Sequence, residues 1–265
     1  MYDVNIAADT AAGKRSRKGL GDGESARTLL RRQRLERETD APRSAEKQSL
    51  NPVLFTFLKD LQATEINLLN ARLVQQKYAK KEYIYLPYDN SEKVCFIIHG
   101  NVEVGYLDES GRELSIDILG PGEAFGALLG RDLTGGFARS IDKAVLAVLS
   151  KDDFAELLER HPRFALRIIA LMNQRLNILE AKLRNLVFSD VKTRICKLLL
   201  TLFQKSGDRR SGLIKIPLTH QDIANLVASS RETASLHLSE LKKSGIIAYE
   251  RKRIRIRALA ELERF

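Results

Sequence analysis

The stretch that most constrains the fold lies between residues 219 and 247, where the sequence predicts two helices joined by a short turn. Thr219 can cap the first helix, and the pair Ser229–Ser230 can cap the second, with Glu232 placed for a capping box. Gly245 lies where the second helix should end. Apolar residues at helical spacing give each helix one buried face: Ile223, Ala224 and Val227 in the first, and Ala234, Leu238 and Leu241 in the second. The pattern predicts a helix-turn-helix.

The second helix of this motif presents polar side chains outward near its beginning. Arg231 offers a guanidinium and Glu232 a carboxylate, and both groups read base edges in a DNA major groove. An ordinary helical hairpin with a solvated charged face is the alternative. We predict DNA contacts from the caps, the turn and the outward face: Thr219, His220, Gln221, Ser229, Ser230, Arg231, Glu232, Thr233, Ser235 and His237.

A two-stranded wing is predicted directly after the helices. Residues 246–249 and 254–256 read as two short strands, and residues 250–253, Glu-Arg-Lys-Arg, form a basic turn between them. Contacts to phosphate add affinity without reading sequence, and we expect them at Arg251, Lys252 and Arg253. The pattern predicts a winged helix-turn-helix DNA-binding domain over residues 189–265.

Positive charge is concentrated in this C-terminal part. The sequence of 265 residues carries a formal net charge of +10. Residues 189–265 contain 16 Lys and Arg against 8 Asp and Glu, which gives +8. The corresponding sums are +3 for residues 1–48 and −1 for residues 49–188. One part of the molecule is therefore expected to attract the DNA backbone strongly.

The first 48 residues are polar and contain few large apolar side chains. They cannot bury enough surface to order themselves, so we predict a disordered basic tail over residues 1–48. A basic arm that adds affinity for DNA is the alternative reading of the same composition.

Between the tail and the winged domain the apolar periodicity changes to two. Four short segments alternate in this way: residues 94–98, 102–106, 114–118 and 146–148. Short strands separated by regularly placed glycines are typical of an antiparallel barrel or jelly roll. We predict a sensor barrel over residues 49–161, with amphipathic helices near its ends at residues 52–70 and 152–161.

A third periodicity follows Pro162. Apolar residues recur at alternating steps of four and three from Ala165 onward, and no proline or glycine interrupts residues 163–187. A helix of this length spans about 40 Å. The heptad spacing predicts a dimerisation helix over residues 162–188, and a helix packed on its own barrel is the alternative. The predicted dimer contacts are Ile169, Met172, Leu176, Leu179, Leu183 and Leu186.

Composition excludes several classes of protein. Cys95 and Cys196 lie far apart without the ligand spacing of a zinc or iron–sulfur site, so we expect buried free thiols in a reducing cytoplasm, no metal and no cofactor. A cupin-like metal enzyme needs several histidines in the barrel, whereas a single histidine, His99, adjoins the predicted strands. No apolar run approaches the ~20 residues of a membrane helix, and no secretory signal is recognisable. We predict a cytoplasmic protein that is not an enzyme.

A barrel, a long heptad helix and a winged helix-turn-helix, in that order, resemble the Crp/Fnr family of cyclic-AMP receptor proteins and fumarate–nitrate regulators. The most specific matching segments are Ser230–Thr233, Gly120–Gly126 and Leu183–Val191. The resemblance implies an α+β fold with a cyclic-nucleotide-binding-like jelly-roll barrel. It also implies a homodimeric transcription regulator that binds a palindromic operator in double-stranded DNA, senses a signal in the barrel and acts with RNA polymerase.

Departures from the family bear on the effector. Ala127 stands where cyclic-AMP binders carry a ribose-binding glutamate, and Gly135–Gly136 where they carry the phosphate-binding arginine. Leu179–Glu180 replaces their polar pair on the long helix, and each missing hydrogen bond would cost roughly 1–3 kcal/mol. We therefore expect an effector other than cyclic AMP, or none. A small-molecule pocket, if present, is expected at Phe125, Gly126, Ala127, Leu128, Arg139, Ser140 and Leu179.

The recognition helix departs from the family as well. Many members carry a second arginine where this chain has Leu236, which is expected either to touch a thymine methyl or to pack on the first helix. We predict a sequence-specific dimeric regulator. A cyclic-nucleotide-responsive regulator and a non-specific architectural DNA-binding protein are the alternatives.

Overall fold

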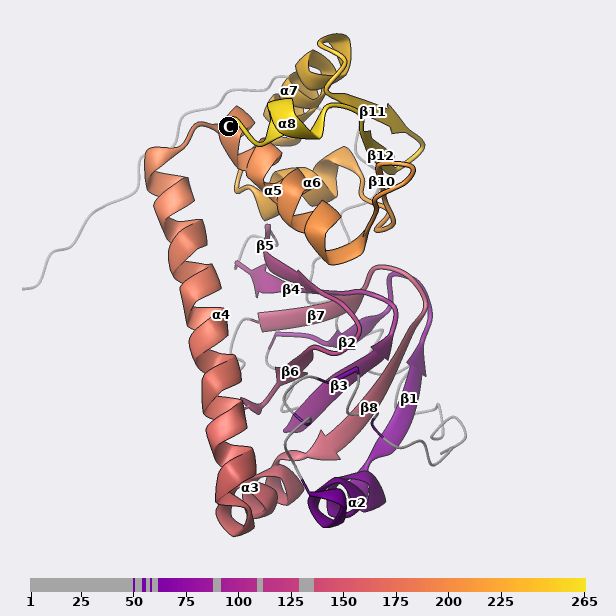
Figure 1. Cartoon of the computed structure of the whole chain (residues 1–265), viewed down its shortest axis with the longest axis vertical. Coiled ribbons are helices and arrows are strands. Elements are labelled where there is room, and N and C mark those ends of the chain that lie inside the picture. Colours follow the sequence, from indigo (N-terminus) through magenta and orange to yellow (C-terminus); the bar gives the residue numbers. More distant parts are fainter. Residues whose placement is uncertain are drawn as a thin grey trace, which may run out of the picture. The chain divides into compact units, whose positions relative to one another are not determined.

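The computed structural model describes residues 50, 54–55, 58, 62–87, 92–108, 112–128 and 136–265. The predicted tail over residues 1–48 and Gly135 of the predicted glycine pair lie outside the described residues. Along the described chain, strands come first, a long helix follows and a smaller mixed domain ends the molecule (Figure 1). This order is the one that the three sequence periodicities predict.

Two four-stranded antiparallel sheets form the first part, in the orders β1-β8-β3-β6 and β2-β7-β4-β5. Their strands are β1 (Val74–Tyr78), β2 (Tyr83–Tyr85), β3 (Lys93–His99), β4 (Val102–Leu107), β5 (Glu113–Leu119), β6 (Ala124–Gly126), β7 (Gly136–Ser140) and β8 (Ala144–Ser150). Apolar side chains from both sheets form one core, which includes Ile97 and Leu146 of the first sheet and Val102 and Ala138 of the second. The predicted jelly-roll architecture has this arrangement of two facing sheets.

Only half of these strands were predicted. β3, β4, β5 and β8 alternate apolar and polar residues, and the sequence identified them. β1 was missed because its residues Val-Gln-Gln-Lys-Tyr are mostly polar, and β2 because it has three residues. β6 was missed because it is short and ends in a glycine, Gly126, and β7 because it begins with a glycine, Gly136.

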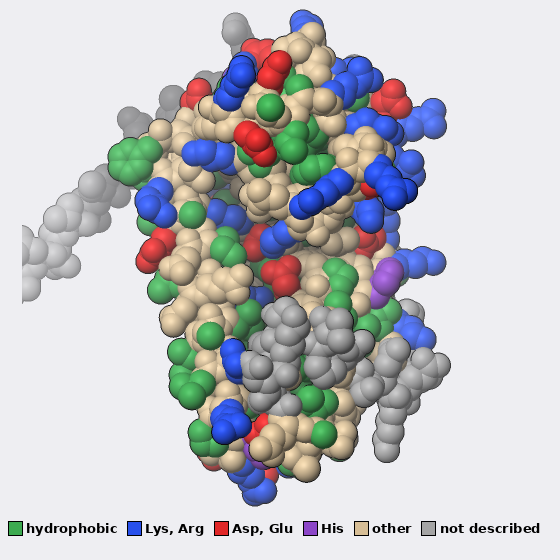
Figure 2. Space-filling view, in the orientation of Figure 1, with side chains coloured by type: hydrophobic (Ala, Val, Ile, Leu, Met, Phe, Trp, Pro, Cys, Tyr) green, Lys and Arg blue, Asp and Glu red, His purple; other side chains and the backbone are tan. Residues whose placement is uncertain are grey.

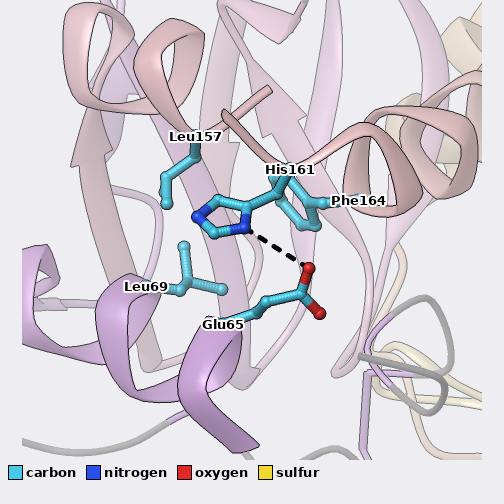
Figure 3. A pocket seen from close by; sticks show the side chains of 5 residues that line it. All are labelled: Glu65, Leu69, Leu157, His161 and Phe164. Atoms are coloured by element: carbon cyan, nitrogen blue, oxygen red, sulfur yellow. Dashed lines mark ion pairs between the residues drawn. The ribbon is translucent and has the colours of Figure 1, made fainter. Parts of the chain in front are cut away.

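Two helices pack against the lower end of the barrel in Figure 1, namely α2 (Ala63–Arg72) and α3 (Lys151–Arg160). The expected helix over residues 52–70 is corrected by the structure, because the described helix begins at Ala63 and ends at Arg72. Glu65 of α2 and His161 enclose a small hollow with three apolar side chains, and their Oε1 and Nδ1 atoms lie 3.4 Å apart (Figure 3). At about 10 Å³ the hollow has room for one water molecule and not for an effector.

The long helix α4 (Pro162–Phe188) begins with proline at its first position and contains 27 residues. It runs beside the barrel along the left of Figure 1. Only Phe164 and Ile168 are buried. A row of large apolar side chains is exposed instead: Leu166, Ile169, Leu176, Leu179, Leu183, Leu186, Val187 and Phe188. Apolar surface on this scale usually marks an interface.

Asp190 separates the long helix from the winged domain. It caps α5 (Val191–Ser206) by accepting a hydrogen bond from Thr193 N at 2.7 Å, and this bond lowers the pKa of its carboxyl. The rest of the domain comprises β9 (Gly207–Asp208), β10 (Leu213–Ile214), α6 (His220–Leu226), α7 (Arg231–Lys243), β11 (Ile247–Glu250), β12 (Arg253–Ile256) and α8 (Leu259–Leu262). The sequence did not predict α5, whose buried Ile195, Leu199 and Leu202 form the centre of the core on which α6 and α7 pack.

Candidate nucleic-acid interface

The N-termini of α6 and α7 are fixed by side-chain caps. Thr219 caps α6 in a capping box, in which its Oγ1 accepts from Asp222 N at 3.1 Å and Asp222 Oδ2 accepts from Thr219 N at 2.8 Å. Ser230 caps α7 by accepting from Thr233 N at 3.1 Å. The predicted capping box of α7 is wrong, because Ser230 rather than Ser229 is the cap and Glu232 is only the second helical residue. The capping box belongs to the first helix.

The recognition helix α7 has one buried face and one exposed face. Ala234, Leu238 and Leu241 are buried against the domain core, as the sequence predicts. Arg231 and Glu232 are exposed in its first turn. Gly245, at φ +77°, ends the helix in the left-handed conformation that glycine adopts without strain. The side chains best placed for base edges therefore lie at the N-terminal end of an otherwise packed helix.

His220 connects three elements of the domain. Its Nδ1 atom lies 2.7 Å from Ser235 Oγ on the recognition helix, and its ring centroid lies 4.7 Å from that of Tyr249 in β11. The Nε2 atom is buried without a hydrogen-bond partner. Burial, followed by the positive charge of Arg231, lowers the pKa of His220. The ring thus joins the helices and the wing, and the DNA contact that the sequence suggested for it stays a prediction.

The remaining predicted helix residues fall into two groups. Gln221 is exposed and Ser229 and Thr233 are half-buried around the two helix starts. His237 instead lies one turn further along, where its Nδ1 is 3.1 Å from Glu240 Oε2 and its side chain is 22% exposed. That carboxylate also lies 3.6 Å from Lys192 of α5. His237 therefore belongs to a polar cluster between α5 and α7, away from the first turn of the recognition helix.

The wing turn is short and basic. Arg251 and Lys252 connect β11 to β12 with φ values of 44° and 72°. A two-residue hairpin turn with both φ values positive matches the twist of its strands and is usually built from Asn-Gly. Here two long cationic side chains occupy those positions and, with Arg253, are exposed. Figure 2 shows Lys and Arg side chains gathered on the upper right, over the wing strands.

Two polar contacts tie the first helix of the motif to the barrel, and the sequence suggested neither. Lys81, in the turn between β1 and β2, places its Nζ 3.2 Å from Asp222 Oδ1. Asn225 Nδ2 donates to Glu113 Oε2 of β5 at 3.3 Å. Burial raises the pKa of Asp222, but the Thr219 backbone N–H and Lys81 outweigh burial, and the net shift is downward. The partners are more than a hundred residues apart, so no local pattern could have revealed them.

Arg139, one of the predicted pocket residues, is engaged within the barrel wall. Its Nη2 lies 2.7 Å from Glu103 Oε2, and Nη1 and Nη2 each lie 2.8 Å from a Glu113 oxygen. Nη1 also donates to the Tyr83 hydroxyl at 2.9 Å. Burial would lower the pKa of Arg139, but the two carboxylates outweigh it and raise the pKa. These partners already use the N–H donors of the guanidinium, which an anionic effector would need for its own binding.

The other predicted pocket residues are mostly packed. Phe125, Ala127 and Leu128 are buried, and Gly126 adopts φ +98° at the end of β6. Ser140 is fully buried, and its hydroxyl donates to the backbone carbonyls of the β1–β2 turn. Leu179 lies elsewhere, on α4, with 42% of its surface exposed. The described residues therefore do not bring the whole predicted set around one cavity.

A larger apolar groove lies between β5, the second half of α4 and α5. Its volume is about 380 Å³, and Ile116, Leu179 and Leu183 are among its apolar lining. Lys182 lines the groove, where its ammonium group donates to the Ile116 carbonyl, and burial lowers its pKa although Asp117 opposes this shift. Because the groove is continuous with the exposed leucines of α4, it forms one apolar surface with them.

The described residues show little sign of metal or membrane chemistry. No group of three or more His, Cys, Asp or Glu side chains there could hold a metal ion. Cys95 and Cys196 are buried free thiols, and burial raises their pKa values to about 12 and about 11. Among the helices that the structure describes, none is long and apolar enough to cross a membrane.

Comparisons with known proteins agree with this architecture. A model of the cyclic nucleotide-binding domain matches residues 75–161, and a model of the Crp-like helix-turn-helix domain matches residues 193–265. The cAMP-activated global transcriptional regulator CRP of Escherichia coli O6:H1 is 30% identical over 183 residues, which cover 67% of this chain and 87% of the relative. A CRP-like cAMP-activated global transcriptional regulator of Mycobacterium tuberculosis is 26% identical over 76% of this chain and 91% of the relative.

The fold has solved counterparts. FixK2 from Bradyrhizobium japonicum superposes with a TM-score of 0.65 at 21% identity, covering 72% of this chain and 96% of that protein. At this level of identity the likeness concerns the fold alone. Both parts of the architecture, barrel and winged domain, therefore recur together in known proteins.

Proposed function

Because the chain belongs to the Crp/Fnr family of transcription regulators, we propose that it reads a specific palindromic DNA site as a homodimer. Proteins with Crp-like helix-turn-helix domains bind DNA, and this chain is a DNA-binding regulator rather than an enzyme. The observation that carries the proposal is the exposed pair Arg231 and Glu232 in the first turn of α7. A bidentate arginine–guanine contact and a carboxylate–cytosine contact are both available to such a pair.

The wing supplies affinity for the DNA backbone, which adds to the base contacts of α7. Arg251, Lys252 and Arg253 are exposed on one turn, and the C-terminal domain carries most of the net charge of the chain. Lysine and arginine contacts to phosphate release counterions and act on any sequence. We assign specificity to the start of α7 and sequence-independent affinity to the wing.

Dimerisation through α4 is supported by its exposed apolar row. Leu176, Leu179, Leu183 and Leu186 lie at heptad spacing and are 42–62% exposed in the single chain. Burying them against the same face of a second copy would remove apolar surface from water on both helices. A two-fold dimer places two recognition helices about one DNA turn apart, which is the reason for a palindromic site.

The effector is proposed to differ from cyclic AMP or to be absent. Arg139 is occupied by Glu103 and Glu113, Ala127 offers no polar side-chain group, and Leu179 is apolar. A cyclic phosphate and ribose would have few partners among these side chains, and unsatisfied polar groups disfavour binding. Control by an unknown small molecule remains compatible with this arrangement.

A cyclic-nucleotide-responsive regulator is the second candidate. Two relatives carry names that describe them as cAMP-activated, and the cyclic nucleotide-binding domain model covers residues 75–161. RNA polymerase is the expected protein partner of either candidate at promoters. Binding of cyclic AMP to the purified protein separates the two candidates.

The test of the proposed function is capture of sheared genomic DNA by the purified protein, followed by footprinting of the most enriched fragment. Affinity for that site and for a scrambled duplex is then measured at several salt concentrations. Sequence-specific recognition by a dimer predicts a two-fold symmetric footprint. It also predicts an affinity for the enriched site about 10³ times or more that for the scrambled duplex. A non-specific architectural protein would enrich no sequence and would bind both duplexes with nearly equal affinity, and that result would reject the proposal.

A further inference from the structure

The exposed face of the recognition helix has an apolar residue at its centre. Glu232, Leu236, Ser239 and Lys243 recur at steps of four, three and four, and all four are exposed. They lie opposite the buried Ala234, Leu238 and Leu241. Leu236 is 57% exposed, so it does not pack on the first helix of the motif. A large apolar side chain therefore occupies the middle of this exposed face.

We propose that Leu236 reads a thymine by packing on its 5-methyl group, which makes it a specificity-determining residue. The proposal rests on the proposed function, because it assumes that α7 enters a major groove. Leu236 follows Glu232 by one helical turn of the same stripe, so it faces the next bases along the groove. In the major groove the thymine methyl is the one apolar group on a base edge.

The surroundings of Leu236 favour an apolar partner. If a leucine packed on a base edge with only polar groups, these groups would lose their hydrogen bonds to water. The leucine could offer no hydrogen bond to replace them. Arg231 and Glu232 read polar edges one turn earlier, so the helix combines polar contacts at its start with an apolar contact in its middle. The expected half-site therefore has a required T·A pair adjacent to the pairs read by Arg231 and Glu232.

Replacement of thymine by deoxyuridine removes the methyl group and nothing else. Each thymine of one half-site in the footprinted operator is replaced in turn, and affinity is measured by titration. One position should weaken wild-type binding by about fourfold, which corresponds to about 0.8 kcal/mol for one buried methyl group. Replacing any of the other thymines by deoxyuridine should change the affinity by much less.

The variant Leu236→Ala should bind the thymine and deoxyuridine duplexes equally at that position. Leu259→Ala is the matched control, because Leu259 is also exposed, at 39%, but lies in α8. It should keep the fourfold sensitivity. Because Leu236 makes no core contact, its variant should retain the wild-type circular dichroism spectrum and its affinity for scrambled DNA.

Three outcomes are distinguishable. Sensitivity at one thymine that disappears only in Leu236→Ala supports the assignment. If the protein binds its operator specifically but no thymine is sensitive, or if Leu236→Ala is as sensitive as the wild type, Leu236 is not a base reader and the assignment is wrong. If the protein selects no operator at all, the proposed function itself has failed.

Discussion

His220 illustrates how a single residue can be judged by its surroundings rather than by its place in a motif. Its position at the start of α6 suggested a contact with DNA. In the structure its ring packs on Tyr249 and contacts Ser235, with Nε2 buried, so it has a structural role whether or not it also touches DNA. Because burial and Arg231 lower its pKa, the folded domain holds the neutral form and protonation opposes folding.

We predict that His220→Gln reduces the loss of stability of the protein on acidification. In the unfolded chain histidine titrates near pH 6.5. The lowered folded-state pKa means that the stabilising effect of neutral His220 is complete above that pH and is lost as the pH falls below it. Urea midpoints at about pH 7.5 and about pH 5.5 should therefore differ more for wild type than for the variant. The exposed His99→Gln is the control and should behave as wild type; equal pH dependence in all three proteins would contradict the prediction.

At the scale of elements, α4 and the two helices of the helix-turn-helix, α6 and α7, were predictable because their signals are local. Heptad spacing marks α4, and Ser230, Gly245 and the buried Ala234 mark the limits and inner face of α7. Strands β1, β2, β6 and β7 were not predictable, because their own residues carry no clear β pattern. They are extended because they pair with neighbouring strands in the folded sheets. Lys81 was unpredictable for the same reason, since its contact with Asp222 is formed by the folded chain alone.

We predict that the double substitution Leu179→Asp and Leu183→Asp yields monomers that no longer bind the operator. Charges placed on the heptad seam would be desolvated in a dimer, at a cost that its apolar contacts cannot offset. Light scattering and DNA titration measure the two effects. Leu68→Asp, an exposed leucine of α2, is the control and should leave both unchanged. A variant that stays dimeric, or wild-type monomers with full affinity, would rule out α4 as the interface.

At the scale of the whole molecule, the barrel and the winged domain meet through apolar contacts of Ile118 and Ile141 and through charged and polar pairs. Lys81 contacts Asp222, Asn225 contacts Glu113, and Lys205 of α5 lies 3.5 Å from Asp117. Glu113 also binds Arg139, so the residue that holds Arg139 in the barrel also contacts the first helix of the DNA-binding motif.

We predict that cyclic AMP at millimolar concentration leaves affinity for the operator unchanged. The reason is that Arg139 is already paired with two carboxylates and that Ala127 and Leu179 cannot hydrogen-bond through their side chains. DNA titration with and without the nucleotide measures the effect, and the Escherichia coli relative serves as the responsive control. Calorimetric detection of micromolar cyclic-AMP binding would overturn the prediction and favour the second candidate function.

The proposed division of work, with base reading by α7 and phosphate binding by the wing, can be measured with two single variants. Arg231→Ala and Arg253→Ala are titrated against the operator and a scrambled duplex at several salt concentrations. Arg231→Ala should weaken operator binding by about 1–3 kcal/mol per half-site while changing scrambled DNA much less.

Arg253→Ala should weaken both duplexes nearly equally and reduce the salt slope by about one unit, because it removes a phosphate contact. If Arg231→Ala instead lowers affinity for operator and scrambled DNA by the same factor, α7 does not read bases through Arg231, and the account of specificity is wrong.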